Sequence, residues 1–169
     1  MREMDEDSVR MAWMRASELT EEASLAMTKR FVAEQAVLFR WFMPEEPTQF
    51  DEVLLQLTMI TWQIVSQRDG GKPRPVAPID LALLERLMKK RQATIGDFMA
   101  GKQAQAMGFI EALETLSDKV EYPQWALLGH LTEAIIDLLE SEEWTRSQAE
   151  SAFVRLTVLV DAFDRVVKS

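Results

Sequence analysis

Residues 48–67 read TQFDEVLLQLTMITWQIVSQ, and this stretch decides the class of fold. Pro47 and Thr48 are suited to open a helix here, because a threonine hydroxyl can cap the first free amides. The apolar side chains would cover nearly the whole circumference of that helix: Phe50, Val53, Leu54, Leu55, Leu57, Met59, Ile60, Trp62, Ile64 and Val65. A helix that is apolar on all sides usually has neighbours on several faces. We therefore predict that the helix at about 48–67 is central.

The composition of the remaining sequence also predicts helices. The chain has 169 residues, 47% of them hydrophobic, which is enough for a substantial core. Only six Gly and six Pro are present, and such a small supply of helix breakers suits long helices joined by few turns. We predict an all-α fold, a single-domain bundle of about six or seven helices over residues 1–169.

Two alternatives remain open before the central helix. Ser8 can cap a first helix, and Thr20, followed by two glutamates, can cap a second. The apolar stripe is continuous enough that residues 8–43 could equally form one helix, which the Met43-Pro44 pair would end.

Four further helices are predicted after the central one. Residues 79–91 form a short amphipathic helix, and Thr94 can cap the next, which runs to about Ser117. Pro123 is suited to the first turn of the sixth helix, and Thr145 can cap the seventh.

Small side chains share one face of the predicted helix from Thr94: Gly101, Ala104 and Gly108 are spaced by three and four residues. Glycine inside a helix costs about 1 kcal/mol relative to alanine, so these positions need a steric reason. The face is either a close helix crossing, in which Gly108 faces Gly129, or the wall of a pocket.

The composition excludes several kinds of site. There is no Cys and only one His, which rules out disulfides, thiolate zinc sites and sites with several imidazoles from one chain. Residues 1–7 are acidic, unlike a secretory leader, and no uncharged apolar span of about 18 residues is present. We expect a cytoplasmic protein that is not inserted in a membrane.

His130 is the one residue that could take part in metal or acid–base chemistry with helical neighbours. It shares a helix face with Glu133, Asp137 and Glu140, but this pattern is more typical of a solvated polar face than of a metal site. No nucleophile motif or phosphate-binding glycine loop accompanies it. The sequence therefore predicts no catalytic residue, no metal and no cofactor.

The net charge of −9 argues against general nucleic-acid binding, yet residues 59–91 carry seven basic and three acidic side chains, a net +4. Residues 68–102 weakly resemble a helix-turn-helix, but residues 103–113, the candidate second helix, offer no arginine to read bases. A nucleic-acid-associated regulator is therefore the alternative interpretation. The candidate contacts to a partner or to phosphate are Arg68, Lys72, Arg74, Lys89, Lys90 and Arg91.

Residues 68–78, RDGGKPRPVAP, form an internal proline-bearing loop. Lys72, Pro75 and Pro78 also fit a basic PxxP ligand for an aromatic groove, although proline punctuation before a helix explains them more simply.

The N-terminal segment 1–18 has two apolar sides and could be an arm that packs on a partner subunit. Its candidate self-association residues are Met4, Met11, Trp13 and Met14, and methionine suits adaptable interfaces. The favoured function is a non-enzymatic helical interaction protein (adaptor, regulator or assembly factor) that forms a homodimer and binds another protein.

Overall fold

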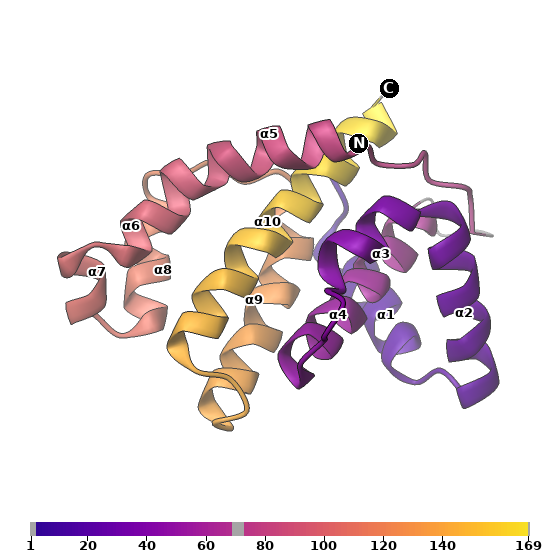
Figure 1. Cartoon of the computed structure of the whole chain (residues 1–169), viewed down its shortest axis with the longest axis horizontal. Helices are drawn as coiled ribbons and strands as arrows, with labels where there is room; N and C mark the ends of the chain where they lie inside the picture. The colour runs from indigo at the N-terminus through magenta and orange to yellow at the C-terminus, as the bar shows by residue number, and fades with distance from the viewer. Residues whose placement is uncertain (1–2, 69–72, 169) are drawn as a thin grey trace.

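The all-α prediction is confirmed in the computed structural model, which describes residues 3–68 and 73–168 (Figure 1). Over these two ranges the secondary structure is helical without any strand, and the helices are more numerous than the six or seven predicted. The elements in chain order are α1 (Glu6–Ser17), α2 (Glu21–Glu34), α3 (Ala36–Phe42), α4 (Gln49–Ser66), α5 (Leu81–Arg91), the π-helical turn η1 (Gln92–Gly96), α6 (Asp97–Ala100), α7 (Lys102–Ala106), α8 (Phe109–Ser117), α9 (Trp125–Glu140) and α10 (Arg146–Lys168).

The predicted central helix forms, but it shares the centre with α10. Thr48 and Asp51 make a reciprocal capping box at the start of α4, which packs against α1, α2, α3 and α10. Helix α10 crosses the middle of the molecule between α5 and α9 and also contacts η1 (Figure 1). Thirteen of its 23 residues are buried, so the α4–α10 pair, and not α4 alone, organises the single connected core.

Residues 8–43 form neither one helix nor two, because three helices cover this region. Asp5 caps α1 in place of the predicted Ser8: its carboxylate accepts a hydrogen bond of 2.9 Å from the Ser8 amide. The Thr20 cap is confirmed, since its hydroxyl accepts from the Ala23 amide at 3.2 Å. A further break at Gln35, where the backbone is not helical, separates α2 from α3.

The helix predicted from Thr94 to Ser117 is wrong at its start and in its continuity. Elements α5, η1 and α6 follow one another without a turn, and the Thr94 hydroxyl donates to the Lys90 carbonyl at 3.1 Å instead of capping. The chain then leaves the helical conformation at Gly101, and again at Gly108, which precedes α8. The expected break therefore lies about two turns later than predicted, and a second break follows it.

The small-residue face is consequently not a helix face. Gly101 and Gly108 both have extended backbone between short helices, while Ala104 is fully buried within α7. A Cβ atom added at Gly108 or at Gly129 would meet no other atom within 4 Å. The close crossing predicted between these two glycines is therefore wrong.

The cap predicted at Thr145 for the seventh helix is confirmed at the start of α10. The Thr145 hydroxyl accepts from the Gln148 amide at 3.2 Å, and the Gln148 side chain accepts from the Thr145 amide at 2.9 Å. Within the ranges described, no helix is both long and apolar enough to cross a membrane.

Candidate interaction surfaces

Arg91, one of the six predicted basic contacts, does not lie on the surface. Arg91 is 3% exposed, and its guanidinium makes two hydrogen bonds to the Asp161 carboxylate, at 2.6 and 2.9 Å. Arg91 also donates to the Glu121 carbonyl at 3.5 Å. Arg91 therefore connects α5 to α10 in the interior. Its neighbours Lys89 and Lys90 are exposed, but Arg91 itself is not available to a partner.

Arg68 and Arg74, two basic residues of the loop, make contacts near the end of α4. The half-buried Arg68 guanidinium donates to the Val65 carbonyl at 3.1 Å, and the Arg74 amide donates to the Ser66 carbonyl at 2.9 Å. Lys72 lies outside the described residues. Of the weak helix-turn-helix resemblance, a break at Gly101 is present, but the candidate second helix at residues 103–113 is divided at Met107 and Gly108 between α7 and α8. The second helix of that resemblance is therefore not continuous.

Tyr122 covers the buried ion pair. The Arg91 guanidinium lies 5.5 Å from the centre of the Tyr122 ring, which favours the positive charge at this place. Burial raises the pKa of Tyr122 to about 12, against an opposing effect of the nearby Arg91 charge. The phenol is therefore neutral over a wider pH range than in the unfolded chain.

We predict that the folded protein loses stability between about pH 10 and 12, because the unfolded chain releases the Tyr122 proton near 10.0 and the folded chain near 12. Below pH 10 both states hold the proton, and the stabilisation is complete. Tyr122 is the one tyrosine in the chain, so tyrosinate absorbance reports it directly, with and without urea. The Tyr122→Phe variant is the control, and a native titration near pH 10 would contradict the prediction.

The predicted self-association residues divide into two pairs. Met4 is buried, and Trp13 stacks on His130 with 6.0 Å between ring centroids. Met11 and Met14 are each 48% exposed and stay available for a partner. Because α1 packs on α4 and α9 of its own chain, the described part of the N-terminal segment is integrated in the bundle.

The sequence interpretation missed the outer side of α2. Phe31 is the one fully buried residue among the 14 of this helix, whereas Leu25 is 55% and Val32 is 36% exposed. Glu22, Ala26, Lys29 and Ala33 are exposed as well. The sequence spacing of these positions places them on one side of a helix. The prediction considered only the apolar stripe on the opposite side. We call the following set the outer α2 face: Glu22, Leu25, Ala26, Lys29, Val32 and Ala33.

The His130 ring contacts Glu133 and Trp13. Its Nδ1 lies 3.4 Å from a Glu133 carboxylate oxygen, and its ring packs on Trp13. Across residues 3–68 and 73–168, no group of three or more histidine, aspartate or glutamate side chains is placed to hold a metal ion.

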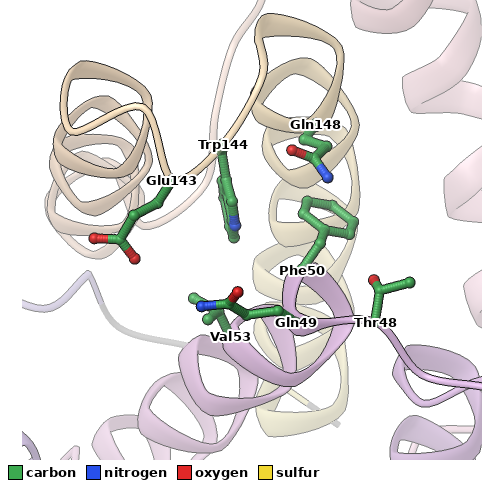
Figure 2. A pocket seen from close by; sticks show the side chains of 7 residues that line it. All are labelled: Thr48, Gln49, Phe50, Val53, Glu143, Trp144 and Gln148. Atoms are coloured by element: carbon green, nitrogen blue, oxygen red, sulfur yellow. The ribbon is translucent and has the colours of Figure 1, made fainter.

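A small cavity of about 210 Å³ opens where the start of α4 meets the start of α10 (Figure 2). Trp144 stands between Glu143 and Phe50, and the Trp144 and Phe50 rings are 4.9 Å apart at 60°. Glu143 is the one ionisable side chain of the lining, which has no imidazole to activate a hydroxyl. The complete lining is Thr48, Gln49, Phe50, Val53, Glu143, Trp144 and Gln148.

Comparison with known proteins adds no functional precedent to these surfaces. Neither family models, nor curated proteins, nor solved structures give a match to this chain. The function is therefore inferred from the exposed surfaces and the contacts described above.

Proposed function

We propose that this chain is a non-enzymatic helical interaction protein that forms a homodimer and presents its remaining surface to another protein. The observation that carries the proposal is the outer α2 face, an exposed apolar stripe on a helix attached to the bundle by its opposite side. Exposed apolar stripes of this kind mark interaction sites in soluble proteins.

The charges on the outer α2 face fit a second copy of the same chain. In a two-fold dimer each residue pair occurs twice, so the face has to complement itself. An antiparallel pairing of two α2 helices, centred between Leu25 and Ala26, brings Glu22 opposite Lys29 of the partner subunit. The same register sets the large Leu25 side chain against the small Ala26 side chain of the partner subunit.

The size of this face sets the expected affinity. A single helix face is smaller than the roughly 800 Å² per partner of a standard stable interface. Met11 and Met14, exposed on the preceding helix α1, provide further apolar surface close by in the sequence. We therefore expect a weak dimer that dissociates in the micromolar range, which suits exchange of partners.

Changing Lys29 to glutamate should weaken the dimer about tenfold, a loss of about 1.4 kcal/mol. The substitution replaces two attractive Glu22–Lys29 contacts by two repulsive ones in the proposed register. Sedimentation equilibrium over a micromolar concentration series measures the effect. The wild-type mass should rise with concentration from the monomer value of 19.4 kDa.

The Glu22→Lys/Lys29→Glu double variant is the sharpest control, because it restores opposite charges and should restore the wild-type dissociation constant. Leu25→Glu should also disrupt the dimer, whereas Leu81→Glu, a matched change at a 49% exposed leucine of α5, should not. A wild-type protein that stays monomeric throughout the series would refute the proposed homodimer. A dimer whose dissociation constant is unchanged by the single Lys29→Glu substitution would refute the α2 register alone.

A further inference from the structure

Residues 73–79 form an extended segment on the surface, here called the proline strap, which leads into α5 (Figure 1). Two of its side chains are buried, Val76 and Ile79, which belong to the hydrophobic core. The other five are exposed: Pro73, Arg74, Pro75, Ala77 and Pro78. The strap is therefore attached by a few anchors and turns most of its side chains outward.

The anchors recur every three residues, which is the repeat of a polyproline II helix. Prolines at 75 and 78 fix their own φ angles and hold the residues before them, Arg74 and Ala77, in extended conformations. One edge of the strap, through Val76 and Ile79, lies against the bundle. The edge through Pro75 and Pro78 and the edge through Arg74 and Ala77 both face solvent.

A single buried glutamine clamps the anchored edge. Gln35, 1% exposed at the break between α2 and α3, donates from Nε2 to the Val76 carbonyl at 3.0 Å and to the Ala77 carbonyl at 3.1 Å. Its Oε1 accepts from the Ile79 amide at 3.2 Å. One side chain thus pairs three backbone groups and fixes the strap from residue 76 to residue 79.

The other end of the strap is held as well. The Arg74 amide donates to the Ser66 carbonyl at 2.9 Å, and the Arg30 guanidinium donates to the Arg74 carbonyl at 3.4 Å. Arg30 is itself positioned by Glu34, at 2.7 Å, and by the Trp62 ring, at 4.9 Å from its centre. The strap is therefore ordered before any partner arrives, which lowers the entropy cost of binding.

We propose that the proline strap is a preformed ligand for a protein domain that reads polyproline II helices in an aromatic-lined groove. Such domains grip two edges of the ligand through a PxxP spacing and leave the third edge unused. In this chain Pro75 and Pro78 supply the spacing, and the unused edge is the one fixed to the bundle. The strap is a surface distinct from the outer α2 face, so its role does not depend on the homodimer.

The test uses the full-length chain and a panel of purified SH3 and WW domains, isotope-labelled for NMR titration. At least one domain should show shifts confined to its aromatic groove. The Pro75→Ala/Pro78→Ala variant should bind that domain at least about tenfold more weakly (~1.4 kcal/mol). Pro47→Ala, a matched change at an exposed proline outside the strap, should bind as the wild type does.

Two further variants test the proposal independently of the prolines and of the homodimer. Ala77→Glu leaves both prolines in place but puts a charge on an outward edge, and it should also weaken binding. Lys29→Glu should leave binding unchanged, which separates this proposal from the homodimer. The inference is overturned if no domain of the panel binds in its groove, or if the double proline variant, folded by circular dichroism, binds like the wild type.

Discussion

Replacing Arg91 with methionine will lower the free energy of unfolding by about 3–5 kcal/mol, because the change leaves the Asp161 carboxylate buried without its partner. The Arg91–Asp161 pair joins α5 to α10, two helices that also share apolar core. Its guanidinium is held by two short hydrogen bonds and lies over the Tyr122 ring. Methionine fills much of the same space but offers nothing to the charge. Urea denaturation followed by circular dichroism measures the loss.

The matched control is Lys90→Met, one residue away on the exposed side of α5, which should change stability by less than about 0.5 kcal/mol. A second variant, Arg91→Met/Asp161→Leu, removes both charges and should recover most of the stability, since a buried ion pair is often replaceable by apolar residues. Equal losses for Arg91→Met and for the double variant would show that shape, and not the unpaired charge, determines the cost.

This ion pair also shows why the site residues were hard to predict. Lys89, Lys90 and Arg91 stand together at the end of the predicted helix 79–91, where cations are favourable. The helix does not end there, because η1 continues it to α6. Asp161 lies 70 residues away, and a single sequence gives no sign that two such distant charges meet.

Several predictions that depend only on residues close together in the sequence are confirmed. The all-α class followed from the apolar pattern of residues 48–67, and the caps at Thr20, Thr48 and Thr145 follow from their hydroxyls. The prediction for Gly101 and Gly108 was wrong because a spacing of seven residues suits both one side of a helix and two successive breaks. Only the packing of α7, with Ala104 buried between them, distinguishes the two.

The residues of the candidate surfaces were likewise only partly predictable from the sequence. Met4 and Trp13 are as apolar as Met11 and Met14, and only the packing of α1 on α4 and α9 decides which of them face inward. The outer α2 face could have been found from helical spacing alone, provided that both sides of the helix were considered. Gln35 could not, since nothing in its sequence neighbourhood points to a loop about 40 residues later.

Replacing Gln35 with methionine should therefore cost about 2–4 kcal/mol, because it removes the partners of three strap backbone groups, and an unsatisfied buried group costs about 1–3 kcal/mol. The loss should be local as well as global. The Ile79 amide should exchange its hydrogen with solvent much faster than in the wild type, which hydrogen-exchange mass spectrometry can detect. Gln56→Met, at an exposed position of α4, should leave both stability and exchange unchanged.

Gln35→Glu separates the two halves of the clamp. A carboxylate still accepts from the Ile79 amide, but it cannot donate to the Val76 and Ala77 carbonyls and places a charge beside their oxygens. It should therefore be at least as destabilising as methionine, although it resembles glutamine more closely in shape. If Gln35→Glu were as stable as the wild type, the two donated hydrogen bonds would contribute little. The strap would then be held mainly by its buried Val76 and Ile79 side chains and by the backbone contacts of Arg74.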